Sequence, residues 1–164
     1  MHFFNYAIGL VFVGCLMLSG GCGESIKSAD DIHNSWNNTN MERITSLYVL
    51  YQRSHVYRGP ANEAKFKDYI RSLDEGTLSL VRVDIDKLDD LFISERDSEP
   101  FEIRYGVRGN DRGPRVPVVF EKTGVDGVRK VGFNAKKIID VDNEQEYQDL
   151  LSGKLPTTEA APAY

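Results

Sequence analysis

Charge is absent from the first 23 residues, since all 20 basic and 25 acidic residues of the chain lie from Glu24 onward. Within the uncharged segment, residues 6–18 form an apolar run. This run is shorter than the roughly 18–20 residues that cross a bilayer as a helix, and its length is typical of the hydrophobic part of a secretory signal peptide. The sequence therefore predicts export, with residues 1–21 as the signal peptide.

Small residues lead from this apolar run to the second of the chain's two cysteines, in the order Leu18-Ser19-Gly20-Gly21-Cys22. The run resembles the lipobox of bacterial lipoproteins, and the resemblance implies cleavage before Cys22, acylation of its thiol and attachment to the membrane through that lipid. Such cleavage would remove Cys15 and leave the mature chain without a free thiol or a disulfide. An ordinary cleaved signal peptide and an uncleaved anchor are the alternatives. We expect an exported protein of the cell envelope, on the periplasmic side or at the cell surface.

The remaining chain divides into three parts. Residues 22–39, the lipidated cysteine and a polar stretch without sustained periodicity, are typical of a flexible tether. In this stretch we expect Trp36 to pack on the folded domain or at the lipid interface rather than to stack on a ligand. A single domain is predicted over residues 40–153, and a disordered tail over residues 154–164. The net charge of −5 argues against nucleic acid as a partner.

Apolar residues at helical spacing begin the domain. Thr39 and the glutamate three residues later have the spacing of a capping box, so a first helix is predicted to run to about His55. Asn62 can cap a second helix, which we expect Gly76 to end. Residues 78–86 partly alternate and partly suit a helical turn, so their structure stays open.

Short β-rich stretches separated by Gly-containing loops follow. They span residues 101–107, 116–122 and 128–133, with an edge strand over 137–140, and Asp142 can cap a last helix that ends at Gly153. Helices followed by strands predict an α+β fold, with N-terminal helices packed on one face of a small antiparallel meander sheet of three to four strands and a short C-terminal helix.

This order resembles the soluble domain of the major pseudopilins of type II secretion. The resemblance rests on the Tyr-bearing first helix, the Gly59-Pro60 break, the second helix around residues 66–73, and residues 97–101 leading into the sheet. It implies the same fold and a calcium-holding loop near the sheet, whose ligands cannot be matched to residues of this chain. The Gly-Phe cleavage site and the glutamate five residues after it are absent, so the comparison informs the fold and not the function.

Common catalytic and metal-binding motifs are absent from the sequence. There is no H-E-x-x-H, G-x-S-x-G, P-loop or G-x-G-x-x-G, and no closely spaced set of zinc ligands. Asp84, Asp86 and Glu95 occupy positions 1, 3 and 12 of an EF-hand loop, but Asp89 stands where the sharp turn needs glycine. We expect solvated acidic turns here and no cofactor.

Four arginines, Arg104, Arg108, Arg112 and Arg115, lie in a Gly-rich loop and its flanks. Guanidinium groups bind phosphate or carboxylate in bidentate geometry, and Gly-rich backbone can present N–H groups to an anion. The alternative is a mobile loop solvated by its own charges, offset by neighbouring acidic residues.

Two functions follow from these observations. The first is a noncatalytic, lipid-anchored binding or structural module, attached to the membrane through Cys22, whose partner is an envelope protein or an anionic polymer. The second is a small envelope hydrolase that uses His55 with a carboxylate such as Glu63 or Asp97. The hydrolase requires a pocket that gathers His55 with carboxylates, whereas the binding module leaves His55 exposed and alone.

Overall fold

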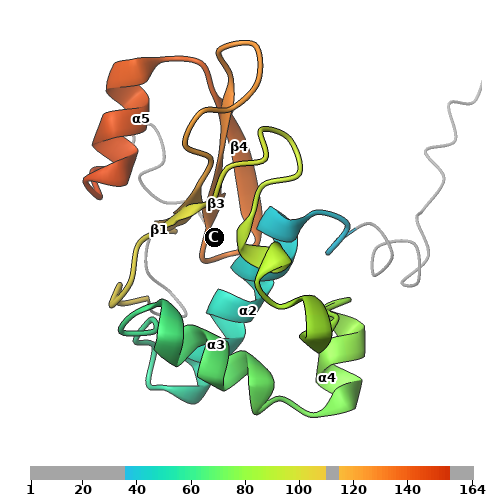
Figure 1. Cartoon of the computed structure of the whole chain (residues 1–164). Helices are drawn as coiled ribbons and strands as arrows, with labels where there is room; N and C mark the ends of the chain where they lie inside the picture. The colour runs from blue at the N-terminus through green and yellow to red at the C-terminus, as the bar shows by residue number, and fades with distance from the viewer. Residues whose placement is uncertain (1–35, 110–114, 156–164) are drawn as a thin grey trace, which may run out of the picture.

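The computed structural model describes residues 36–109 and 115–155 (Figure 1). The predicted signal peptide, Cys22, Arg112 and the tail beyond Leu155 lie outside these residues. The elements in chain order are α2 (Asn40–Ser54), α3 (Glu63–Arg71), α4 (Glu75–Leu80), two 3₁₀ turns (Ile85–Lys87 and Asp90–Phe92), β1 (Glu102–Ile103), β2 (Pro117–Phe120), β3 (Arg129–Phe133), β4 (Lys137–Val141) and α5 (Glu144–Leu151). The predicted α+β fold is confirmed.

Helix α2 begins at a complete capping box. The Thr39 side chain accepts from the Glu42 backbone N–H, and the Glu42 carboxylate accepts from the backbone N–H of Thr39 at 3.1 Å. Two free donors of the first turn are thereby satisfied. Trp36 precedes the cap and packs on this helix, where its indole Nε1 donates to Ser46 Oγ at 2.8 Å. The predicted helix and the expected packing of Trp36 on the domain are both confirmed.

Helix α3 is capped by Asn62 as predicted, but it ends at Arg71, before Gly76. The expectation that Gly76 ends this helix is wrong, because Asp74 starts a new one. Its carboxylate accepts from the Thr77 N–H at 3.0 Å and places Gly76 inside the first turn of α4. Residues 78–86, left open by the sequence, complete α4 and enter the first 3₁₀ turn.

The sheet is an antiparallel meander in the order β1-β2-β3-β4, as predicted. Strand β1 is much shorter than the predicted stretch of residues 101–107. Beyond it, residues 106–109 leave the sheet and bond instead to the segment that follows α2.

The apolar core fills both faces of the sheet. Val119 shares one face with Met41 and Thr45 of α2, whereas Phe120 on the opposite face contacts Tyr147 of α5, with ring centroids 5.8 Å apart. The predicted packing of the N-terminal helices on the sheet and the predicted short C-terminal helix are confirmed, and α5 covers the face opposite α2 (Figure 1). Alternate residues of the central strands are apolar on both sides, so each face can pack against a helix.

Both ends of α5 can be compared with the prediction. The cap is Asn143 and not Asp142, because it is the Asn143 side chain that accepts from the Glu146 N–H at 3.0 Å. Gly153 follows the helix with φ +90° and donates to the Leu150 carbonyl, so the predicted end is confirmed.

Candidate anion-binding site

Two segments that are distant in sequence pair beside the C-terminal half of α2. Residues 57–60 and 106–109 form a short antiparallel ladder, which we call the arginine ladder. The Gly109 N–H donates to the Tyr57 carbonyl and the Gly59 N–H to the Val107 carbonyl, both at 2.8 Å. These bonds place Arg58 directly opposite Arg108.

The register decides which side chains of the ladder face solvent. Gly59 and Gly109 face α2 so closely that a Cβ on Gly59 would lie 2.0 Å from the Tyr48 hydroxyl, and one on Gly109 would lie 2.9 Å from Gln52 Oε1. Successive side chains of an extended segment point to opposite sides. Arg58 and Arg108 consequently point away from α2, and both are exposed.

The two arginines are close neighbours of like charge. The ladder bonds flank their position and do not join the two residues to each other, which defines a non-hydrogen-bonded pair with Cα atoms about 4.5 Å apart and side chains close together. Like charges in such a pair are destabilising. Neither guanidinium makes an ion pair with an acidic side chain of the described residues. Among residues 36–109 and 115–155, the ladder therefore presents two cations side by side without an acidic partner.

A pair of amide side chains holds the ladder and the far end of its loop. Gln52, 3% exposed, donates from Nε2 to the Val107 carbonyl at 3.0 Å and accepts from Asn134 Nδ2 at 3.2 Å. Asn134 Oδ1 in turn accepts from the Val116 N–H at 2.9 Å. This Gln52–Asn134 clamp fixes the backbone on both sides of the Gly-rich loop, at residues 107 and 116.

The turn that carries the chain from α2 into the ladder is strained. Val56 and Tyr57 have φ of 51° and 59°, and Val56 is 86% exposed. The left-handed region costs an L-residue roughly 1–2 kcal/mol and is especially unfavourable for a β-branched side chain. The hydrogen bond from the Tyr57 N–H to the Gln52 carbonyl, 2.7 Å long, closes the turn.

The structure separates the four arginines predicted from the sequence. Arg108 lies in the ladder and Arg115 is exposed beyond the loop, while Arg112 lies outside the described residues. Arg104 is half-buried and donates from Nη1 to the Pro117 carbonyl at 3.1 Å, so it has a structural partner. Sequence reasoning missed Arg58, and only the pairing of distant segments identifies it.

The residues of the predicted hydrolase are not brought together. The exposed His55 ring stacks on Tyr51 with centroids 3.9 Å apart, and its Nδ1 lies 2.9 Å from the Tyr51 carbonyl oxygen. The Glu63 carboxylate pairs with Lys67 Nζ at 2.6 Å. Asp97 accepts from the Gly124 N–H at 2.7 Å. No described carboxylate bonds to His55.

A second polar cluster ties the turn after the 3₁₀ segment to the sheet. Glu121, 2% exposed, lies 2.6 Å from Arg96 Nη1 and accepts from the Lys130 N–H at 2.9 Å. Burial raises the pKa of Glu121, although the Lys130 N–H and Arg96 act in the opposite direction. Burial also acts to raise the pKa of Asp97, but the N–H of Gly124 and other donors outweigh it, so that pKa lies below its usual value. All buried side-chain polar atoms of the described residues are hydrogen-bonded, so this cluster is structural.

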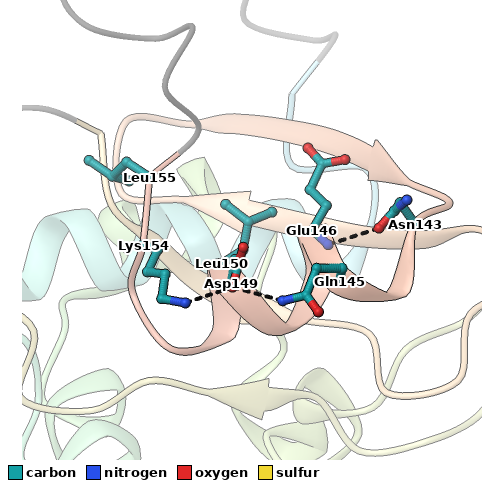
Figure 2. A pocket seen from close by; sticks show the side chains of 7 residues that line it. All are labelled: Asn143, Gln145, Glu146, Asp149, Leu150, Lys154 and Leu155. Atoms are coloured by element: carbon teal, nitrogen blue, oxygen red, sulfur yellow. Dashed lines mark hydrogen bonds and ion pairs between the residues drawn. The ribbon is translucent and has the colours of Figure 1, made fainter.

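A groove of about 580 Å³ lies beside α5 (Figure 2). Its polar groups already bond to one another: Asp149 accepts from Gln145 Nε2 at 3.1 Å and from Lys154 Nζ at 2.9 Å. The groove contains no nucleophile with an adjacent base. Across residues 36–109 and 115–155, no three His, Cys, Asp or Glu side chains are placed to hold a metal ion.

Comparisons with protein-family models, with curated proteins and with solved structures found no match. The resemblance to pseudopilins therefore stays a prediction. Of the helices that the structure describes, none has both the length and the apolar content required to cross a membrane.

Proposed function

We propose that this protein is a noncatalytic binding module, exported and held at the membrane by a lipid on Cys22, that binds an anionic partner of the cell envelope through the arginine ladder. The observation that carries the proposal is the exposed Arg58–Arg108 pair, which has no acidic partner among the described residues. A protein retains such a repulsive pair at a cost in stability. An anionic partner offsets that cost when it binds.

The contacts of His55 favour binding over hydrolysis. The predicted hydrolase needs a carboxylate beside the His55 ring and a pocket that holds the substrate. Here the ring lies against Tyr51 and Tyr69 on an exposed helix end. The hydrolase is therefore the less favoured function.

Membrane attachment is supported by the sequence of residues 18–22 and can be measured separately. We expect the protein purified from its native membrane to have the mass of Cys22–Tyr164 plus acyl chains. The variant Cys22→Ser should lose the acyl mass. An unlipidated mature chain in the unsubstituted protein would contradict the lipid anchor. The binding proposal does not depend on this result and is tested separately.

Binding is tested with the mature chain, residues 22–164, carrying Cys22→Ser so that no lipid contributes. Its retention on washed envelopes is compared with that of the Arg58→Glu/Arg108→Glu variant. Because a charge-assisted hydrogen bond contributes about 1.5–3 kcal/mol, we expect retention to weaken by about tenfold or more. Lys122→Glu is the matched control, since Lys122 is exposed and lies outside the ladder. Equal retention of the ladder variant and the control would contradict the proposal.

A further inference from the structure

We propose that the arginine ladder binds a phosphoryl group, with Arg58 and Arg108 donating to oxygens of the same group. This inference rests on the proposed function, because it takes the ladder as the binding surface and names the chemistry of its ligand. Three properties of the ladder lead to it: the two charges of the arginine pair, the charge of its surroundings and the rigidity of the backbone.

The charge of the pair exceeds what one carboxylate neutralises. A carboxylate has about four acceptor sites and can accept from two guanidinium forks, but it carries a single negative charge. One of the two guanidiniums would then keep its charge without a counter-charge. A phosphoryl group in a monoester has three acceptor oxygens and a charge of about −1.5 to −2 at pH 7. It can accept from both forks and neutralise both charges.

The local charge favours a strongly anionic group. Residues 53–60 and 104–109, which contain the ladder, include four arginines and no Asp or Glu, and Glu102 and Asp111 are the nearest acidic residues along the second segment. Glu63 lies close enough to contribute to the raised pKa of Tyr105, for which burial is the larger cause. That carboxylate is already paired with Lys67. Because the whole chain carries a net charge of −5, attraction of an anion has to be local to this surface.

The backbone of the ladder is fixed before any ligand binds. Gly59 and Gly109 lie against α2, and the Gln52–Asn134 clamp holds Val107 and Val116. Binding therefore requires ordering of two side chains and no rearrangement of the chain, which lowers the entropy cost of recognition. Phosphoryl groups occur on lipid headgroups and on soluble molecules, and the ladder recognises the chemistry that the two sources share.

The test follows the backbone N–H resonances of Gly59 and Gly109 in the mature chain while inorganic phosphate is added. We expect saturable shifts that are half-complete at a concentration at least tenfold lower than with acetate, and that are absent with chloride at the same ionic strength. The Arg58→Gln/Arg108→Gln variant should lose the shifts, and Lys122→Gln should keep them. Equal responses to phosphate and acetate would overturn the inference.

Vesicles distinguish the two sources. Phosphatidylcholine vesicles with and without phosphatidic acid are sedimented with the same proteins. If the protein binds the phosphatidic acid vesicles through its arginines, the ligand is a lipid headgroup. This holds with or without a response to inorganic phosphate. A response to inorganic phosphate without vesicle binding assigns a soluble ligand. The absence of both overturns the inference.

The experiments test the phosphoryl ligand and the proposed binding function separately. If the arginine variants lose envelope retention but neither phosphate probe binds, the binding function stands and the phosphoryl ligand is wrong. If phosphate binds but envelope retention does not depend on the arginines, the proposed function is wrong. The double glutamine variant relieves the repulsion within the pair, so a raised urea midpoint is expected and shows that the variant is folded.

Discussion

Gly59 occupies a position where the chain has no room for a side chain, since a Cβ there would lie 2.0 Å from the Tyr48 hydroxyl oxygen. We predict that Gly59→Ala destabilises the protein by about 3 kcal/mol, because the buried tyrosine ring must move. Urea unfolding at pH 7 measures the change. In a Tyr48→Phe background the cost should be smaller, because the atom closest to the new Cβ is removed.

Gly76→Ala is the matched control for this prediction. Gly76 lies in the exposed helix α4, where alanine is favoured over glycine by up to about 1 kcal/mol. A similar loss of stability in both variants would contradict the explanation based on Tyr48.

Substitution of Val56 is predicted to stabilise the protein, whereas that of Gly59 destabilises it. Its left-handed backbone is unfavourable for a β-branched residue, and its side chain is 86% exposed, so replacing it removes little packing. Val56→Asn should stabilise the protein by about 1 kcal/mol, because Asn tolerates this conformation. Val125→Asn serves as the control, since Val125 is also partly exposed but does not have positive φ. Equal midpoints for the Val56 variant and the unsubstituted protein would show that the turn stores no strain.

At the scale of elements, the turn over residues 94–99 is held to the β2–β3 hairpin by Asp97, which accepts from the Gly124 and Thr123 N–H groups at 2.7 and 3.3 Å. Its folded pKa is lower than its unfolded pKa of about 3.9. The carboxylate therefore stabilises the fold above about pH 4, and this contribution is lost as the pH falls through the folded pKa.

We predict that Asp97→Asn costs about 1–2 kcal/mol at pH 7 and that the difference from the unsubstituted protein shrinks below about pH 4. Urea midpoints of both proteins between pH 7 and pH 3 measure this. The raised pKa of Glu121 acts in the opposite direction, since protonation of that buried group favours the fold. Burial is its largest cause and is common to both proteins, while the smaller contribution of the Asp97 charge is lost in the variant. A difference that is constant with pH would contradict the role of the Asp97 charge.

For the whole molecule, the sheet joins two apolar clusters that lie on its opposite faces. Trp36, the chain's single tryptophan, contacts α2 on one face, and Leu150 of α5 is buried at 1% exposure on the other. We predict that Leu150→Ala costs about 2–5 kcal/mol and shifts the unfolding transitions measured by Trp36 fluorescence and by far-ultraviolet circular dichroism equally. A fluorescence transition that does not move would show that α5 unfolds separately.

Local signals predicted much of this fold. Capping at Thr39 and Asn62 and the four β-rich stretches are short-range patterns, and the structure has helices and strands there. The errors arose where neighbouring polar residues compete for a cap, since Asp74 begins a helix around Gly76 and Asn143 replaces Asp142.

The candidate site was only half predictable, for a physical reason. Arg108 lies in an arginine-rich loop that can be identified in the sequence. Arg58 is placed opposite Arg108 by backbone hydrogen bonds between distant segments, which the sequence does not predict. Arg104 belongs to the same loop by sequence, yet its guanidinium donates to a carbonyl of β2. Composition identifies charge, but only the register of the ladder determines which charges meet.

Helix α2 separates the point where the chain enters the domain from the arginine ladder. The described chain reaches the domain at the N-terminus of this helix, and the arginine ladder follows its C-terminus (Figure 1). The helix has 15 residues and is therefore about 22 Å long. A domain fastened by its N-terminus to a flat support would hold its paired guanidiniums on the outward side when α2 stands upright, and beside the support when the helix lies flat. A ligand in the supporting layer itself could reach them only in the flat orientation, so an energy-transfer measurement from Trp36 to an acceptor dye in the bilayer would distinguish the two.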